Sequence, residues 1–519
     1  MRAHRDRAFY GVHLGFNMSS SSEEFLEKGL LEVQKPDPAF LRISKKLFRC
    51  LRVLKPSFLG RTKASPTKLR RTAYLDGMRG FAALMVYVLH HELWAHEFKD
   101  RILENSFGYN GEHYFATLPF LRNFITGGHY AVGIFFVLSG YVLSAKPLMH
   151  IHAGDFVLLG DNLGSAVFRR WFRLYLPIIV TTLGIVLLWH VFGISANLHP
   201  QRTLGAELWV WYNEFKSFTW ILNSSPPVWF TYNPHTWTIP LEFKGSLVVY
   251  VTSTALSRCT RTARLCCEIA LIFYFIWIVD GLYFALFAGG LLLCDLDLLA
   301  AKDELPTWMT RHLKPHSSII FYVLFITSLY LGGVPSYSRE LADLRSSPGW
   351  QILSYLKPDA AFDYKWFYQF WAAVFLVASV PRISWLKNFF ETRFCQYLGR
   401  ISYMFYLVHG PIMSTLGDRL YAAVGMQRTN HAIVVPHWIG RFPIPSIGPL
   451  GLELNFLLPH LILLPFTLWI GEVLTVLVDD PCVRFAAWLR KLTMPAAATE
   501  EPILQQFEVR NDAVVISED

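Results

Sequence analysis

Ten long apolar runs, separated by short polar segments, dominate this chain of 519 residues. The hydrocarbon core of a bilayer is about 30 Å thick, and a helix needs about 20 apolar residues to cross it. Charged residues make up 17% of the chain, whereas soluble domains carry roughly 25%. We therefore predict an all-α, polytopic membrane protein with about ten transmembrane helices, at 73–94, 128–145, 174–196, 236–256, 267–280, 282–299, 317–333, 366–381, 397–416 and 455–478.

The fifth and sixth of these segments form one continuous apolar run, which is longer than a single crossing requires. Asp280 and Gly281 lie in the middle of this run. An Asp-Gly pair is typical of a turn. We therefore predict two helices joined by a tight turn at these two residues.

Lysine and arginine are unevenly distributed, with 16 of the 48 in residues 1–72. Cytoplasmic loops of membrane proteins carry an excess of these residues. If the N-terminus is cytoplasmic, the other inner segments hold 18 of them and the outer loops hold 12. We therefore predict a cytoplasmic N-terminus. The formal net charge of +9 does not indicate nucleic-acid binding, because the basic residues lie between apolar segments and not on one soluble face.

The chain divides into three parts on this interpretation. We expect a basic cytoplasmic arm over 1–72, a transmembrane domain over 73–480 and a cytoplasmic tail over 481–519. Within the arm, residues 35–58 place apolar side chains at helical spacing between basic ones. This pattern fits a helix lying on an anionic inner leaflet, and it equally fits a linker with a charged face. The host membrane is expected to be the plasma membrane or an endomembrane.

The first predicted span carries three ionisable residues on one helical face. Asp76 and Arg79 are three residues apart, and His90 follows Arg79 by eleven residues, which is three helical turns plus about 20°. Ionisable groups inside a membrane are costly and usually functional. We take Asp76, Arg79 and His90 as candidate catalytic residues. The alternative is an Asp76–Arg79 pair at one membrane edge and His90 at the other.

Glu242 lies about one helical turn inside the fourth predicted span. A buried carboxylate needs a counter-ion. Lys244 is two positions away on a helix and points elsewhere, so we expect Arg79 or an arginine of another helix. Alternatively, Glu242 and Lys244 both extend to the membrane interface.

Two further spans carry polar groups. Arg169, Arg170 and Arg173 lie near the inner end of the third span, where they suit a cytoplasmic anion site or a stop-transfer anchor. The ninth span places Tyr403 and His409 along one helix, with the histidine near the outer end.

Familiar catalytic motifs are incomplete. The stretch from His91 to His96 resembles the H-E-x-x-H zinc motif but is one residue too long, so the two imidazoles do not share a helical face. Ser139-Gly140 lacks the glycine two positions before the serine that a nucleophile elbow requires. We therefore expect no metal site.

Five stretches, taken together and in order, resemble the acyltransferase 3 family of integral-membrane O-acyltransferases, in a fungal-looking version. They cover residues 74 to 411 and read "YLDGMRGFAALMVYVLHH", "GIFFVLSGYVLS", "RRWFRLYLP", "HTWTIPLEF" and "LGRISYMFYLVHGPI". The predicted layout of ten spans with a cytoplasmic N-terminus also resembles that family.

The resemblance implies transfer of an acyl group, typically acetyl, from acyl-CoA to a hydroxyl of a carbohydrate, lipid or secondary metabolite. It implies acyl-CoA as a co-substrate and no bound cofactor. Arg79 and His90 match the residues regarded as essential in the family, and Trp237 and Glu242 match its Trp-x-x-x-x-Glu pattern, which we assign to the substrate and to catalysis. The remaining matches, which we assign to the donor, are Arg169, Arg170, Arg173, Tyr403 and His409.

On this hypothesis His90 is the general base for the acceptor hydroxyl, and Arg79 stabilises the thioester oxyanion or orients the donor. Glu242 orients one of these two residues. The competing hypothesis is a proton-coupled secondary transporter, because intramembrane Asp, Arg, His and Glu also form proton relays. The aromatic outer loop 197–235 suits either sugar stacking or an interfacial aromatic belt.

Overall fold

The computed structural model describes residues 69–194, 200–222 and 229–495, and all the regular structure in these ranges is helical. The helices described below all lie within one compact unit, Lys63–Asp519. The predicted arm over 1–72, including the segment 35–58, lies almost wholly outside the described residues.

Each of the ten predicted membrane segments is mainly helical over its described residues. The principal helices are α3 (Ala73–Ala95), α5 (Gly128–Ala153), α6 (Phe156–Phe192), α8 (Thr238–Ala255), α9 (Arg261–Phe273), α10 (Leu282–Ala300), α11 (Ser317–Gly332), α13 (Tyr364–Ser379), α15 (Arg393–Ile412) and α19 (His460–Leu474). Among the described residues, five helical stretches are long and apolar enough to cross a membrane, namely Gly128–Ala153, Phe156–Phe192, Leu282–Ala300, Met309–Gly332 and Leu454–Leu492. A sixth results if Tyr364–Arg382 and Ser384–Phe390, which meet at 100°, form one span.

The turn predicted within the longest apolar run is present. α9 continues as a π-helical turn over Tyr274–Ile278, Val279 adopts an extended conformation, and α10 begins at Leu282. The amide of Gly281 donates to the carbonyl of Phe275 at 3.0 Å. Two helices therefore replace one overlong span.

The predicted bounds of the third span were wrong at its N-terminal end. The span was expected to begin at residue 174, but α5 runs to Ala153 and α6 begins at Phe156. Asp155 caps α6 by accepting from the amide of Leu158 at 3.3 Å, and Gly154 has a φ of 72°. A helix begins and ends at such capping signals and not where its apolar run ends. Because arginine is a good helix former, the basic segment before residue 174 belongs to the same helix.

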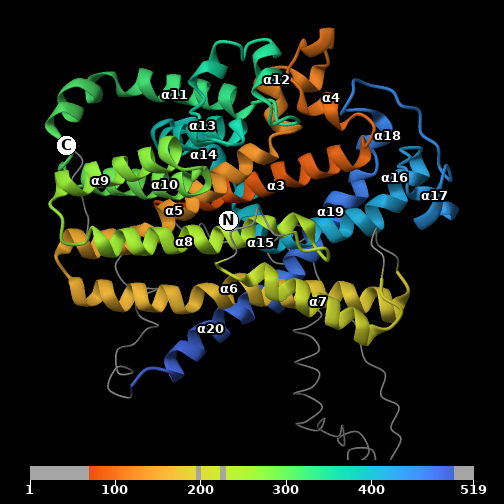
Figure 1. Ribbon diagram of the computed structural model, residues 1–519, viewed down its shortest axis with the longest axis horizontal. Helices are drawn as coiled ribbons and strands as arrows, with labels where there is room; N and C mark the ends of the chain where they lie inside the picture. Colours follow the sequence, from red (N-terminus) through yellow and green to blue (C-terminus); the bar gives the residue numbers. More distant parts are fainter. Residues whose placement is uncertain (1–68, 195–199, 223–228, 496–519) are drawn as a thin grey trace, which may run out of the picture. The chain divides into compact units, whose positions relative to one another are not determined.

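The length of α6 has a consequence for its arginines. Its 37 residues extend about 56 Å at ~1.5 Å per residue, nearly twice the thickness of a bilayer core. Arg169, Arg170 and Arg173 therefore lie within a continuous helix, with four turns of helix before them. Figure 1 shows α6 running roughly parallel to α8, which it contacts.

Shorter helices complete the described chain. They are α4 (Asp100–Glu104), α7 (Leu204–Thr219), α12 (Leu341–Ser346), α14 (Ser384–Phe390), α16 (Asp418–Val424), α17 (His431–Val434), α18 (Leu454–Leu457) and α20 (Asp480–Leu492). The predicted C-terminal tail thus begins with a helix, α20, which packs against α6.

A close helix crossing at the site joins α3 to α15. A Cβ atom on Gly80 would lie 2.2 Å from the amide nitrogen of Gly399, and one on Gly399 would lie 2.3 Å from the carbonyl oxygen of Asp76. Small residues allow membrane helices to approach this closely. The crossing brings the polar face of the first predicted span against the ninth, about 320 positions later in the chain.

Candidate active site

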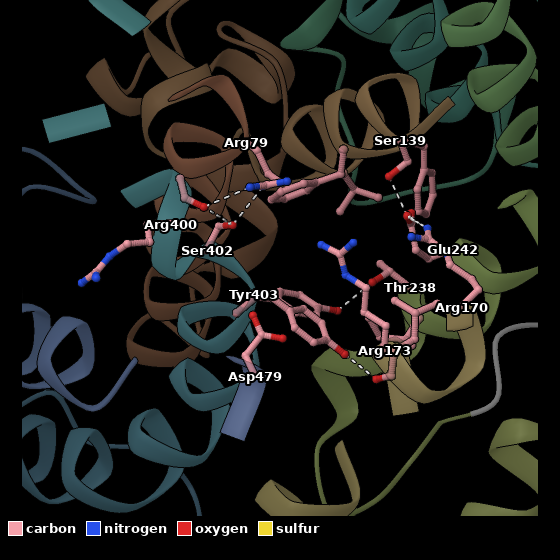
Figure 2. Close-up of a pocket in the computed structure, with 17 residues that line it drawn as sticks. Arg79, Ser139, Arg170, Arg173, Thr238, Glu242, Arg400, Ser402, Tyr403 and Asp479 are labelled. Carbon is pink, nitrogen blue, oxygen red and sulfur yellow. Dashed lines mark hydrogen bonds and ion pairs between the residues drawn. The ribbon is translucent and has the colours of Figure 1, made fainter. Parts of the chain in front are cut away.

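Five long helices surround a cavity of about 200 Å³ that we call the arginine cavity (Figure 2). Its wall includes Arg79 from α3, Ser139 from α5, two arginines from α6, Glu242 from α8 and two tyrosines from α15. The α6 residues are Arg170 and Arg173, and the tyrosines are Tyr403 and Tyr406. Two residues of opposite charge, Arg400 and Asp479, also line it, as do the hydroxyl residues Thr238 and Ser402.

Arg79 is fixed by both helices of the α3–α15 crossing. Its Nη2 donates to Asp76 Oδ1 at 2.9 Å and to the carbonyl of Gly399 at 3.2 Å, and its Nε donates to Ser402 Oγ at 3.2 Å. The side chain nevertheless remains 40% accessible. Asp76 therefore orients Arg79, and the guanidinium is presented to the cavity in a fixed position.

Glu242 has an arginine of another helix as its partner. Its Oε1 atom accepts from Arg170 Nη2 and from Ser139 Oγ. Figure 2 shows this group on the side of the cavity opposite Arg400. The carboxylate is thus coupled to Arg170, and it contacts neither Arg79 nor His90, the two residues it was expected to orient.

Arg173 is exceptional among the cavity arginines because it makes no hydrogen bond or ion pair with any described residue. Its side chain extends into the centre of the cavity (Figure 2). The wall holds four arginines, including Arg79 and Arg400, but only the carboxylates of Glu242 and Asp479. The cavity therefore has an excess of positive charge, and guanidinium groups bind phosphate well.

A cluster of three histidines lies next to this cavity. His90 Nδ1 is 2.8 Å from His409 Nε2, and His409 Nδ1 is 2.6 Å from the carbonyl oxygen of Tyr406. The ring of His235 lies 4.3 Å from that of His90 and 5.0 Å from that of His409, measured between centroids. We call these three residues the histidine cluster.

The hydrogen bonds determine the tautomers of two of these rings. A carbonyl only accepts, so His409 Nδ1 carries the hydrogen and its Nε2 offers a lone pair. His90 Nδ1 must then donate to that lone pair. The remaining nitrogen of His90, Nε2, is left with its own lone pair and is able to take up a proton.

Tyr406 separates the histidine cluster from the arginine cavity. Its side chain lines the cavity, and its backbone carbonyl accepts from His409. Its hydroxyl donates to the carbonyl of His235 and is 2.7 Å from Thr238 Oγ1. One residue therefore contacts both the anion-binding cavity and the group of potential bases.

The structure does not bring all the predicted site residues together. Arg169 is absent from the cavity wall, and its Nε donates to the carbonyl of Ser165 on its own helix at 3.1 Å. His409 contacts His90 and not the arginines. Trp237 packs its ring against those of Tyr283 and Trp366, at 6.2 and 6.0 Å. Of the predicted donor residues, Arg170, Arg173 and Tyr403 share the cavity.

Comparison with known proteins shows the family of this chain. Residues 72–473 match the model of the acyltransferase domain of the acyltransferase 3 type. This range is more than three quarters of the chain and runs from the start of α3 nearly to the end of α19.

The chain belongs to the acyltransferase 3 family. This acyltransferase is 32% identical to the O-acetyltransferase PaAT-1 of Phomopsis amygdali, over 71% of its own length and 78% of the relative. It is 22% identical to the acyltransferase R4 of Phoma sp. (strain ATCC 20986 / MF5453), over 69% and 86% of the two chains. It is 21% identical to the acyltransferase clz18 of Cochliobolus lunatus, over 71% and 88%. No solved structure matches it.

Sequence reasoning missed several residues of this acyltransferase site. His235 precedes the fourth predicted span, where a lone histidine is unremarkable. Ser139 was considered only as a nucleophile, whereas here it donates to Glu242. Asp479 lies beyond the last predicted span, on the π-helical turn Thr475–Asp479. Ser139 and His235 lie in two of the quoted stretches and Asp479 lies in none, but the role of all three depends on contacts between helices.

The histidine cluster also has the composition of a metal site. One nitrogen from each of His90, His235 and His409 lies within 4.8 Å of the others. Three imidazoles are a common ligand set for zinc. The sequence search for a contiguous zinc motif gave no indication of this grouping, because the three residues lie on α3, on the turn before α8 and on α15.

Proposed function

We propose that this protein is a membrane-embedded O-acyltransferase that moves an acyl group, in the simplest case acetyl, from acyl-CoA to an alcohol. One observation carries the proposal: a cavity with excess arginine, including the unpaired Arg173, adjoins a histidine whose Nε2 is available as a base. An anion-binding site next to a general base is what transfer from a phosphorylated thioester requires.

The arginine cavity supplies the donor site in this proposal. Arg173 and Arg79 face the phosphates or the thioester oxygen of acyl-CoA, and the thioester lies at the Tyr406 end of the cavity. Glu242 and Ser139 hold Arg170 in place from the opposite side. Glu242 is thus a positioning residue for the donor, and it does not orient the catalytic base.

The chemical step uses His90 as the base. His90 Nε2 takes the proton of the acceptor hydroxyl as the hydroxyl oxygen attacks the thioester carbonyl carbon. Arg79, which is held by Asp76, Gly399 and Ser402, orients the donor. The carbon–sulfur bond then breaks and the coenzyme leaves as a thiolate. His90 transfers its proton to that thiolate sulfur. His409 holds His90 in the tautomer that exposes Nε2.

The proposed topology has ten spans with a cytoplasmic N-terminus. The helices at all ten predicted segments and the inner-loop excess of Lys and Arg support it. In this topology the N-terminal part of α6 extends toward the cytoplasm, where acyl-CoA is made. The enzyme resides in an endomembrane or the plasma membrane.

The test uses protein purified in lipid nanodiscs and incubated with labelled acetyl-CoA and cell extract. We expect release of free coenzyme A together with a labelled ester, and loss of both in His90→Ala and His90→Gln. Wild-type rates in both variants, at equal protein levels, would refute His90 as the base. An intact thioester under all conditions would instead favour the secondary transporter.

A further inference from the structure

A second cavity, much larger than the first, lies on the other side of the histidine cluster. Its volume is about 720 Å³, and its wall comes from the C-terminal ends of α3, α6 and α15, the segment before α8, and α19. We call it the apolar cavity. Binding cavities for small molecules measure about 300–1,000 Å³, so this one is large enough for a substrate.

The lining of the apolar cavity contains almost no charged side chains. Among its described residues only Arg419 is permanently charged, and that side chain donates to the carbonyl of Thr415 at 2.8 Å. Most of the wall is aliphatic or aromatic, as with Leu188, Trp189 and Ile470. A carbohydrate would leave many hydroxyl groups without partners on such a wall, and each buried unpaired group costs about 1–3 kcal/mol.

Two polar side chains of the wall have unsatisfied atoms where the wall meets the histidine cluster. His235 and Asn233 both line the cavity, and His235 Nδ1 and Asn233 Oδ1 have no hydrogen-bond partner in the described chain. A Cβ atom on Gly410 would lie 2.3 Å from the first of these atoms and 3.2 Å from the second. The glycine therefore lets both groups pack against α15, directly after His409.

Part of the wall is also open to the surroundings of the helices. Leu188 and Ile194, at the C-terminal end of α6, are both among the exposed large hydrophobic residues. In the proposed topology this end of α6 lies in the outer half of the membrane. A molecule dissolved in the bilayer can therefore reach the cavity laterally.

We propose that the apolar cavity binds the acyl acceptor and that this acceptor is a lipid-soluble alcohol whose hydroxyl points toward His235 and His90. The inference rests on the proposed acyl transfer. A volume of 720 Å³ accommodates roughly 25 non-hydrogen atoms at ~30 Å³ each. The hydroxyl loses its proton to His90 and its oxygen bonds to the acyl carbon as the carbon–sulfur bond breaks, so the two substrates approach the histidine cluster from opposite cavities.

The experiment compares two extracts of cells that lack the protein, one in organic solvent and one in water. Each is incubated with purified enzyme and labelled acetyl-CoA, and the label is followed into organic-soluble and water-soluble products. We expect the label in an organic-soluble ester. Label in water-soluble products alone would overturn the proposed acceptor class while leaving acyl transfer intact. No transfer from acetyl-CoA to either extract would refute both proposals.

Cavity-filling variants test the location. Ile470→Trp on α19 and Leu188→Trp on α6 place a bulky ring in the apolar cavity, and the matched control Leu461→Trp changes a residue of α19 that is 72% exposed and outside the wall. Both filling variants should raise the acceptor KM about tenfold or more with an unchanged KM for acetyl-CoA. If both filling variants elute as folded protein and form the organic-soluble ester as the control does, the acceptor binds elsewhere.

Discussion

His90 and His409, which are 319 positions apart in the chain, share a hydrogen bond of 2.8 Å between Nδ1 and Nε2. The bond joins the first and ninth predicted spans at their polar faces. Because His409 is itself fixed by the carbonyl of Tyr406, the pair resembles other catalytic arrangements in which a second group orients the base. The predictions below concern this pair and the residues around it.

His409→Ala should lower kcat for acyl transfer by about 10- to 100-fold, because His90 loses the acceptor that fixes its tautomer. The KM for acetyl-CoA should stay near the wild-type value, since His409 does not line the arginine cavity. Steady-state kinetics on nanodisc preparations provide the measurement. His312→Ala, at an exposed histidine, is the matched control, and an unchanged kcat in His409→Ala would contradict the role.

Arg173→Ala should raise the KM for acetyl-CoA about tenfold or more, because an arginine without a protein partner is free to bind phosphate. Arg169→Ala is the matched control. It lies four residues away on the same helix but bonds to its own backbone, so its KM should change less than twofold. An equal rise in the KM for acetyl-CoA in both variants would contradict a specific role for Arg173 in binding the donor.

Glu242→Gln should destabilise the protein by about 3–5 kcal/mol, because it leaves the charge of Arg170 unpaired in a largely buried site. Arg170→Met in the same chain should recover part of the loss. Denaturant or thermal unfolding of the two single variants and the double variant measures the coupling. Additive losses would mean that the pair contributes no interaction energy.

A buried cluster beyond the C-terminal end of α3 should make stability depend on pH. Burial opposes protonation of His96, but Glu453 and Glu92 outweigh it and raise the pKa of His96 to about 9. His96 Nε2 is 3.0 Å from Glu453 Oε2. A raised pKa in the folded state stabilises the protein fully below the unfolded value near 6.5, and this contribution is lost as the pH rises through 9.

The same cluster acts in the opposite direction on the acid side. Burial raises the pKa of Glu453, but the hydrogen bond from His96 and its charge lower it overall, so its contribution is lost as the pH falls below about 4.5. On the alkaline side, loss of the His96 contribution should lower the unfolding temperature as the pH rises from 6.5 to 9. His96→Gln should flatten that alkaline decline, and an unaltered profile would exclude the cluster as its cause.

Added zinc should inhibit acyl transfer reversibly, because the histidine cluster can supply three imidazole nitrogens to the ion. Binding would occupy the lone pair that His90 needs as a base. The activity should return with EDTA, and His235→Ala should require at least about tenfold more zinc for the same inhibition. A zinc response identical in this variant would place the inhibitory site elsewhere.

Local patterns in the sequence were sufficient for some of these features. The Asp76–Arg79 pair follows from helical spacing and is present at 2.9 Å, and the turn at Asp280–Gly281 follows from two residues unsuited to a membrane helix. The expected arginine partner for Glu242 from another helix is also present, as Arg170. Such inferences succeed because hydrophobicity, helical period and the cost of buried charge act over a few residues.

Other features depend on how the helices pack. Arg169 and Arg173 read alike in the sequence, yet only Arg173 faces the arginine cavity, because one face of α6 turns toward α8 and α15. His235 opens the stretch "HTWTIPLEF", but nothing in that stretch indicated that it would lie beside His90.

The sequence by itself thus determined the helical class, the positions of the long apolar helices and a short set of polar candidates, since each depends on neighbouring residues. Only the tertiary structure decided which candidates meet. The close α3–α15 crossing at Gly80 and Gly399 sets the partners of Arg79 and His90. It also leaves a charged and an apolar cavity on opposite sides of the histidines, an arrangement made by packing between residues more than 300 positions apart.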